Sequence, residues 1–397
     1  PLTGAGRMVS KLGFSFELTE EQEDIKRAVR EFCEKEFDPE LALELDRKEE
    51  FPMELYKKAA KLGFTSMRFP EEYGGQGYGI LEDCLVIEEM CRADSSLGIA
   101  ITAATFASDL ILMYGTEEQK EKYIPKVCSG EWISAGAFTE PARGSDLASR
   151  LDTKAVRYGD TWYINGVKTF ITNAPVANFF VVLCQTDLKA HPPHRGQSLF
   201  VVDRGVEGLE VTKLKDKMGI RPSLTGEVAF NDVKVPSDAL LGELNKGFYY
   251  AIEFFDKSRV GVAAQAVGIA QGAFEIAFKY AKEREAFGQP IIQFEGVSFK
   301  LADAATLIEA ARLLTYKAAW LIDQGKPDPL ITSMAKTFAS EIAVRVTEWC
   351  IGILGGYGYF GDYRVERYHR DAIVTTIYEG TNEIQRLTTL RYLLRRF

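Results

Sequence analysis

A glutamate near the carboxyl end of the chain has the surroundings that a general base needs. Glu379 lies in the segment 376–386, between a tyrosine and Gly380, directly before a stretch with helical periodicity. Apolar neighbours such as Ile373 and Ile377 would desolvate its carboxylate and raise its pKa toward the range useful for proton abstraction. The alternative is an ordinary role as a capping or dipole partner of the following helix.

Two segments in the middle of the chain suit a flat ring with polar edges. In segment 138–146, proline and glycine favour a turn whose hydroxyl and N–H groups can hold a phosphate or the edge of a heterocycle. In segment 165–173 a tight Asn-Gly turn precedes an alternating strand, which would place Phe170 and Thr172 on one face. An ordinary connector and an ordinary hairpin are the alternatives.

Two later segments have residues that can meet a pyrophosphate and an adenine. Segment 284–290 begins with Arg284 at the end of a predicted helix and has Phe287 beside a glycine. Segment 355–361 concentrates glycine and aromatic residues at the end of another predicted helix, where bare backbone can approach a ligand closely. A capped helix end and a long helix–helix turn are the alternatives.

The composition excludes several other chemistries and partners. The 397 residues include 48 Lys+Arg and 57 Asp+Glu, and this net charge of −9 predicts no nucleic-acid binding and no attraction to anionic membranes. Three histidines and no CxxC pair leave a zinc or haem centre with almost no ligands. The six scattered cysteines are expected to be core residues of a reducing compartment. No apolar run approaches the ~20 residues that span a bilayer, so we expect no stable membrane association. An enzyme of this composition would depend on an organic cofactor.

The residue pattern changes twice along the chain and predicts an α+β protein of three domains. Short β-rich runs without helices between them favour an antiparallel sheet over a nucleotide-binding parallel sheet. Long apolar helices near the end favour a buried bundle with subunit contacts. The predicted divisions are an expression remnant and flexible start, an N-terminal α-helical domain, a middle β-sandwich or barrel domain, and a C-terminal four-helix-bundle domain: 1–13, 14–133, 134–245 and 246–397.

Taken together in this order and spacing, the five segments resemble the acyl-CoA dehydrogenase family over about residues 16–394. The resemblance implies bound FAD, a homotetramer, an acyl-CoA substrate, electron-transfer flavoprotein as electron acceptor, and a cytoplasmic location, with the mitochondrial matrix as second choice. Glu379 matches the catalytic base of one branch of the family, while another branch places its glutamate at the position of Ser258. The implied reaction removes the α-proton of the thioester to Glu379 and the β-hydrogen as hydride to flavin N5, which gives the 2-enoyl-CoA.

The resemblance also assigns roles to individual residues. The positions implied for cofactor binding are Phe138, Thr139, Ser145, Phe170, Thr172, Arg284, Phe287, Gly355, Gly356, Thr381 and Glu383. The positions implied for substrate binding are Ser145, Arg259, Tyr378 and Gly380. The N–H group of Glu379 and a flavin ribityl hydroxyl would hold the thioester oxygen. Arg284, Phe287 and the glycine pair match residues that meet the FAD of a neighbouring subunit. Most members have Trp where this chain has Phe170, and often Gln where it has Gly352 and Glu295.

The acyl group is left open by the sequence. Members that act on glutaryl-CoA carry an arginine in the stretch matching 95–102, which has no cation here. Small residues in and after this stretch are interpreted as lining a roomy apolar cavity for a medium, branched, cyclic or aryl group: Gly98, Ala100, Ala103 and Ala104. Arg143 would meet a phosphate or an acidic substrate group. The alternatives to a dehydrogenase are an acyl-CoA oxidase and a catalytically silent assembly factor that binds flavin or acyl-CoA; retention of Glu379 argues against the second.

Overall fold

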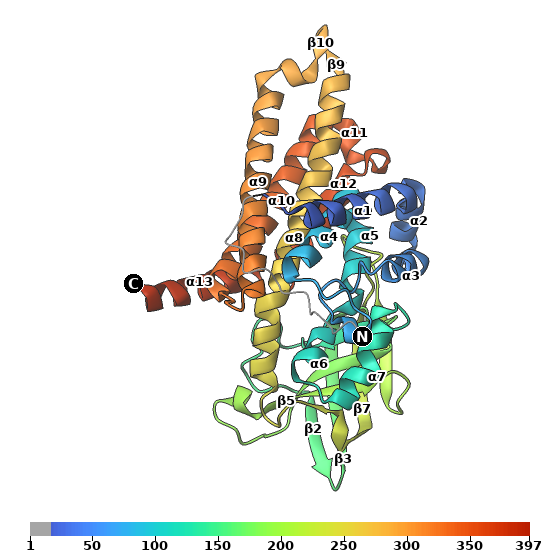
Figure 1. The fold of residues 1–397 in the computed structure, drawn as a ribbon, viewed down its shortest axis with the longest axis vertical. Helices are drawn as coiled ribbons and strands as arrows, with labels where there is room; N and C mark the ends of the chain where they lie inside the picture. Colours follow the sequence, from blue (N-terminus) through green and yellow to red (C-terminus); the bar gives the residue numbers. More distant parts are fainter. Residues whose placement is uncertain (1–16) are drawn as a thin grey trace, which may run out of the picture.

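The computed structural model describes residues 17–397, and the predicted start at 1–13 lies outside the described residues. The chain has an α+β fold in which a helical N-terminal region, a β region and a helical C-terminal region follow one another, as predicted (Figure 1). The β region lies at one end of the elongated molecule, and the long C-terminal helices extend to the other end.

Between residue 17 and the first strand, the structure has seven α-helices. Their bounds are α1 Glu20–Glu36, α2 Pro39–Lys48, α3 Met53–Lys61, α4 Ile80–Ala93, α5 Ser95–Thr102, α6 Ser108–Tyr114 and α7 Glu117–Cys128. Helix α1 begins at the predicted capping box, in which the side chains of Thr19 and Gln22 each accept a hydrogen bond from the other's backbone N–H. The sequence predicts that Pro39 stops this helix. Instead α1 ends at Glu36 and Pro39 opens α2, where a missing N–H costs nothing.

The middle region is one eight-stranded sheet. Its strands are β1 Ser134–Ala137, β2 Lys154–Tyr158, β3 Thr161–Thr172, β4 Phe179–Gln185, β5 Gln197–Asp203, β6 Leu209–Leu214, β7 Thr225–Pro236 and β8 Leu240–Leu241. The order is β6-β7-β3-β2-β4-β5-β8, with β1 beside β4. Neighbours pair antiparallel, as predicted, except that β1 and β2 each pair parallel with β4. The chain between β1 and β4 is long enough for the crossover that parallel pairing requires.

The C-terminal region consists of helices and one small hairpin. Its elements are α8 Gly247–Glu283, β9 Glu285–Ala286, β10 Gln289–Pro290, α9 Glu295–Asp323, α10 Pro329–Leu354, α11 Gly356–Tyr359, α12 Val365–Thr375 and α13 Asn382–Arg396. The sequence predicts α8, α9, α10 and α13 with nearly these bounds but does not predict α12. The β9–β10 hairpin caps the far end of α8 and α9, and α13 projects sideways from the body (Figure 1).

Glycines allow α4 to approach two other helices closely. A Cβ at Gly268 or Gly272 of α8 would lie 2.3 Å from the carbonyl oxygen of Glu88 or 2.2 Å from that of Arg92 on α4. A Cβ at Gly98 of α5 would lie 2.6 Å from the backbone nitrogen of another α4 residue. The interpretation of Gly98 as part of a roomy cavity is therefore wrong, because its small size is used for helix packing. Ala100 and Ala104 likewise belong to the N-terminal core, and all six cysteines are buried and free, as predicted.

One buried carboxylate joins the three regions. Asp371 of α12 accepts hydrogen bonds from the hydroxyls of Ser95 and Ser96 at 2.6 and 2.5 Å, and from the backbone N–H of Ile220 at 2.5 Å. These donors belong to the N-terminal and middle regions, so the helix that leads to Glu379 is fixed against both.

Two segments are long and apolar enough to cross a membrane by length and composition, Ser95–Tyr114 and Gly247–Glu283. About two thirds or more of each apolar window is buried inside the protein, at 67% and 72%. Core helices of globular proteins pass the same test, so this observation is weak evidence for a membrane span.

We predict that Gly272→Ala destabilises the protein, although alanine is the better helix former by about 1 kcal/mol. The new methyl group would collide with the α4 backbone, and overpacking of this kind costs about 1–3 kcal/mol. Thermal unfolding should then start several degrees lower than in the wild type. The control is Gly296→Ala in α9, where a Cβ meets nothing within 4 Å. An unchanged or raised midpoint for Gly272→Ala would show that the α4–α8 contact is not close packed.

Candidate functional site

The turn between α12 and α13 holds Glu379 in a backbone conformation that few residues other than glycine adopt. The φ angles of Glu379 and Gly380 are 56° and 86°, both in the left-handed region. This conformation costs about 1–2 kcal/mol for a residue with a side chain. A Cβ at position 380 would also lie 2.7 Å from Nε2 of Gln385. Contacts with the rest of the protein must therefore hold the turn in place.

Three side chains supply these contacts by donating hydrogen bonds to the two carbonyl groups of the turn. Arg259 Nε of α8 donates to the Glu379 oxygen at 3.0 Å. Gln385 Nε2 of α13 donates to the oxygens of Glu379 and Gly380 at 3.2 and 3.0 Å. Lys336 Nζ of α10 donates to the Gly380 oxygen at 3.0 Å. We call Arg259, Lys336 and Gln385 the turn clamp.

The carboxylate of Glu379 is held on one side only. Ser258 Oγ, one residue before Arg259 on α8, donates to its Oε2 at 2.7 Å. Among residues 17–397, no donor contacts the other oxygen, Oε1, and no acceptor takes the backbone N–H of Glu379. One carboxylate oxygen and one amide donor of the same residue are therefore available to a ligand.

Burial sets the protonation behaviour of this carboxyl group. Desolvation raises the pKa of Glu379 to about 7, opposed by the Ser258 hydrogen bond and by the positive charges of Arg259 and Lys336. The direction agrees with the sequence-based expectation. A carboxylate with a pKa near neutrality is well matched to proton abstraction at physiological pH.

Two of the residues implied for substrate binding lie beside Glu379. Arg259 is 6% exposed and forms an ion pair with Asp256 at 2.6 Å, in addition to its bond to the Glu379 carbonyl. Tyr378 donates its hydroxyl to Oε1 of Gln265 on α8. Arg259 thus belongs to the support of the base, and its contact with a CoA group stays a prediction.

The segment that starts with Phe138 is anchored by a buried ion pair that the sequence does not reveal. Phe138 itself packs against Phe255 of α8, with ring centroids 5.1 Å apart. Lys168 of β3 is fully buried and donates to the Phe138 carbonyl at 2.9 Å and to Glu140 at 3.0 Å. The Thr139 carbonyl accepts from a β3 amide at 2.9 Å. The segment is therefore fixed to β3, the strand that leads to Phe170.

Phe170 presents an open aromatic face near the end of β3. Its side chain is 70% exposed and its φ is 57°, at a register shift between β3 and β7. The predicted regular alternation is interrupted there, since Lys168 and Thr169 are both buried. The residue thus remains available to a planar ligand in a backbone conformation that local packing has to maintain.

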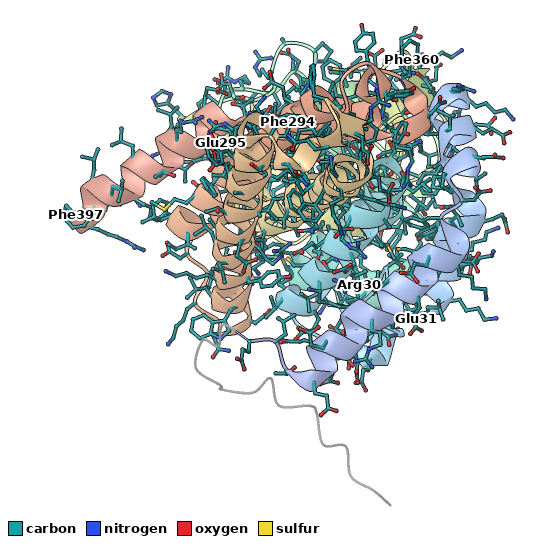
Figure 2. All side chains as sticks on the ribbon, turned by 90° about the horizontal axis from the view of Figure 1, so that it is seen from above. Arg30, Glu31, Phe294, Glu295, Phe360 and Phe397 are labelled. Carbon is teal, nitrogen blue, oxygen red and sulfur yellow. The ribbon has the colours of Figure 1, made fainter. Side chains whose placement is uncertain are left out.

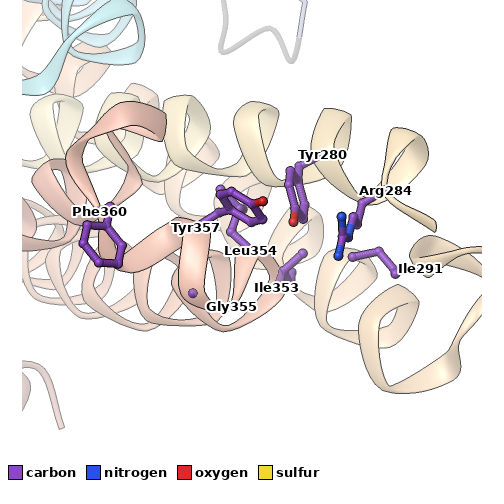
Figure 3. Close-up of a pocket in the computed structure, with 9 residues that line it drawn as sticks. Tyr280, Arg284, Ile291, Ile353, Leu354, Gly355, Tyr357 and Phe360 are labelled. Carbon is purple, nitrogen blue, oxygen red and sulfur yellow. The ribbon is translucent and has the colours of Figure 1, made fainter. Parts of the chain in front are cut away.

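The arginine and glycine segments meet in a cavity of about 470 Å³ (Figure 3). Arg284 at the end of α8 lies on one side of it and Gly355 at the end of α10 on the other, and Gly356, the first residue of α11, also lines it. The rest of the lining is mostly aromatic and aliphatic: Tyr280, Ile291, Ile353, Leu354, Tyr357 and Phe360. A Cβ at either glycine would meet nothing within 4 Å, so the backbone is open to a ligand. The sequence-based grouping of Arg284 with the glycine pair is thus reproduced in space.

Glu379 and this cavity lie beside widely separated parts of α8. Ser258, which contacts Glu379, precedes Arg284 by roughly 26 residues of α8, which is about 39 Å of helix. Phe287, in the β9–β10 hairpin beyond Arg284, is 97% exposed. Within one chain the predicted cofactor residues therefore form two separate groups.

The remaining predicted site residues have simpler surroundings. Thr381 is the N-cap of α13, where its hydroxyl accepts from the N–H of Ile384, and Glu383 is exposed in the first turn of that helix. Ser145 is exposed in the loop before β2. Arg143 pairs with Asp152. Their roles toward a cofactor or a substrate stay predictions.

Sequence reasoning missed the groups that support the site. Lys336, Gln385, Lys168 and Glu140 are all buried polar residues whose partners lie in other elements. Two lysines stand at positions that the sequence pattern predicts to be buried, Lys336 on the apolar side of a helix and Lys168 in a β-rich run. Because a buried lysine is rare unless it has a partner, these positions could have indicated the supporting contacts.

The three regions of the chain match three family models. These are described as the N-terminal, middle and C-terminal domains of acyl-CoA dehydrogenase, and they match residues 19–131, 135–233 and 245–394.

Individual relatives cover nearly the whole chain. A short-chain specific acyl-CoA dehydrogenase of Clostridium acetobutylicum is 43% identical over 94% of this chain and 97% of the relative. The caffeyl-CoA reductase–Etf complex subunit CarC of Acetobacterium woodii is 41% identical over 95% and 99%. The solved structure of butyryl-CoA dehydrogenase from Megasphaera elsdenii superposes with a TM-score of 0.92 at 41% identity and covers 96% of this chain and 100% of that one.

We predict that Ser258→Ala raises the pKa of Glu379 above about 7, because the lost hydrogen bond favours the ionised form. The expected rise is about one pH unit. Infrared difference spectra across pH 5–9 follow the carboxyl stretch, and Glu379→Gln identifies the band. Ser258→Thr keeps the hydroxyl and should titrate like the wild type. A midpoint in Ser258→Ala at or below the wild-type value would mean that the hydrogen bond does not stabilise the carboxylate.

Proposed function

The chain belongs to the acyl-CoA dehydrogenase family, and from this premise we propose that it is an FAD-dependent dehydrogenase of short-chain acyl-CoA thioesters with Glu379 as its base. The observation that carries the assignment of the base is the Glu379 carboxyl in the turn that precedes α13, half-buried and with one oxygen that no donor among the described residues contacts. The short acyl chain is supported by relatives described as short-chain specific and as butyryl-CoA dehydrogenase.

The chain's own residues account for the proton half of the reaction. Oε1 of Glu379 has no donor among the described residues and is the atom that takes the α-proton, while Ser258 keeps Oε2 in place. The unpaired N–H of Glu379 is the donor for the thioester oxygen, where negative charge develops as the proton leaves. Both groups belong to Glu379. The left-handed turn therefore fixes the position of the backbone N–H that stabilises the oxyanion relative to Oε1, which accepts the proton.

FAD, when bound, supplies the acceptor for the β-hydrogen as hydride. The residues present fit this group in two places. Phe170 offers an exposed aromatic face beside the anchored segment of Phe138 and Thr139. The cavity between Arg284 and the glycine pair offers a cation and open backbone to a pyrophosphate and an adenosine. Ser145, Thr172, Phe287, Thr381 and Glu383 complete the proposed set.

A second copy of the chain is part of this proposal. The cavity at Arg284 is about 39 Å of helix from the base, so it serves the FAD of a neighbouring subunit rather than the one beside its own Glu379. Helix α13 and the residue that follows it carry exposed apolar side chains at helical spacing: Leu387, Leu390, Leu394 and Phe397. The helix projects from the body with Phe397 at its tip (Figure 2). A projecting helix with an apolar stripe is a surface that another subunit would cover, and we propose the homotetramer implied by the family.

The direction of the reaction has a second candidate. One relative over 95% of this chain is described as a caffeyl-CoA reductase–Etf complex subunit. The same site would catalyse the reverse reaction, in which protonated Glu379 returns a proton to the α-carbon of an enoyl-CoA. In either direction we propose electron-transfer flavoprotein as the electron partner, which the name of that relative supports. A cytoplasmic location stays a prediction.

We predict that butyryl-CoA bleaches the flavin absorbance of the purified protein under anaerobic conditions, and that longer and aryl thioesters do so more slowly. Glu379→Gln should bind FAD and thioester but bleach at least about 10³-fold more slowly, because it lacks the base. No bleaching with any thioester would refute the dehydrogenase assignment. Reoxidation of the bleached enzyme by enoyl-CoA faster than its reduction by acyl-CoA would favour the reductase, and rapid peroxide formation in air would favour the oxidase.

We predict that Leu390→Glu combined with Leu394→Glu lowers the molar mass measured by light scattering from that of a tetramer, because charges replace the apolar stripe of α13. FAD content should fall with it, since the cavity at Arg284 would lose its neighbour. Leu62→Glu directly after α3 is the control, because Leu62 is also exposed, at 57%, but lies far from α13 in the sequence. A double variant that keeps both mass and FAD would contradict the shared site.

A further inference from the structure

The turn clamp contains a lysine that the proposed reaction does not use. Lys336 is fully buried on α10 and forms no ion pair within the described residues. Its ammonium group contacts two neutral oxygens, the Gly380 carbonyl at 3.0 Å and Oδ1 of Asn382 at 2.9 Å. Burying a charge without a directly paired counterion is costly. Such a position calls for an explanation beyond packing.

The charged groups around Lys336 show where its charge acts. The Glu379 carboxylate is the largest electrostatic influence that favours the ammonium form, followed by smaller contributions from Glu383 of α13 and Glu341 of α10. Arg259 of α8 opposes it but is itself neutralised by Asp256. Desolvation dominates and lowers the pKa of Lys336 to about 8. The buried ammonium group and the half-buried Glu379 carboxylate are thus two opposite charges separated by the turn.

The hydrogen bonds show that Lys336 also fixes geometry. Asn382, the first residue of α13, binds both Lys336 and the hydroxyl of Ser340, which lies one turn further along α10. Gln385 donates to the same Gly380 carbonyl that Lys336 binds. The start of α13 and the turn before it are therefore attached to α10 through one ammonium group.

We propose that Lys336 is a positioning residue for the base: its ammonium group fixes the left-handed Glu379–Gly380 turn and supplies the positive charge that keeps the Glu379 carboxylate ionised. This inference rests on the proposed function of Glu379 as the base. Lys336 acts through the Gly380 carbonyl and through space, without contact with the substrate.

The test compares two substitutions that separate charge from hydrogen bonding. Lys336→Met removes both, and Lys336→Gln keeps a donor for the Gly380 carbonyl but removes the charge. In both variants the infrared titration of Glu379 should shift upward by about one pH unit, because a nearby cation is lost. The acid limb of kcat/KM should shift by the same amount. Hydrogen exchange in residues 378–385 should rise in Lys336→Met and less in Lys336→Gln.

A matched control separates this role from general stability. Lys217 is a half-buried lysine that also donates to backbone carbonyls, those of Ile220 and Ser223 in the middle region, and its pKa is also lowered to about 8. Lys217→Met should lower the unfolding temperature without moving the titration of Glu379. Should Lys336→Met fail to fold, Lys336→Gln decides the effect of the charge.

The outcomes also separate this inference from the proposed function. At pH 7 we expect kcat to fall about 10- to 100-fold in Lys336→Met, with unchanged affinity for an S-alkyl-CoA thioether, which has no acidic α-carbon. An unshifted Glu379 titration in a folded Lys336 variant would overturn the inference even if the wild type is an active dehydrogenase. Failure of the wild type to react with any thioester would refute the proposed function, and the infrared titration would still test Lys336.

Discussion

Keeping a carboxylate largely out of water, yet still able to ionise, is the requirement on which the rest of the structure depends. Desolvation alone would hold Glu379 protonated, and its pKa of about 7 is a compromise between that penalty and three favourable contributions. The Ser258 hydrogen bond, the Arg259 charge and the Lys336 charge come from two different helices. The long bundle of the C-terminal region is what brings these helices to a single turn.

Charge balance explains why so many buried charges are found around one base. Glu379 and Asp256 carry negative charge, and Arg259 and Lys336 carry positive charge, so the group is close to neutral when Glu379 is ionised. Protonation of Glu379 during the reaction leaves one positive charge in excess. That excess favours return of the proton and would also stabilise an anionic thioester oxygen nearby. The same arrangement would therefore serve both directions of the proposed reaction.

Local residue patterns were sufficient for the order of the three regions. Helix periodicity and short β runs predict the α–β–α order, whereas Glu379 as the base is implied by the family resemblance and stays a prediction. The supporting residues could not be predicted, because Lys336, Arg259 and Gln385 approach the turn from separate helices and their pairing depends on tertiary packing. The small residues of α5 were misread for a related reason. A glycine can signify a cavity or a close helix contact, and only the position of α4 shows that Gly98 makes the contact.

The length of α8 connects the chemistry of the base to assembly. Its early turns carry Ser258 and Arg259 beneath the base, and its end carries Arg284 at the cavity, about 39 Å further along the helix. A rigid helix cannot bring both ends to one cofactor, so under the proposed assignment a cofactor at Glu379 would contact the Arg284 of another chain. Binding of FAD and association of subunits would then be thermodynamically linked, since each adds contacts that only the assembled form provides. Helix α13, which projects from the body and carries the apolar stripe, begins at Asn382, three residues after Glu379. Contacts of another subunit with that stripe would therefore act on the same short stretch of chain that positions Glu379.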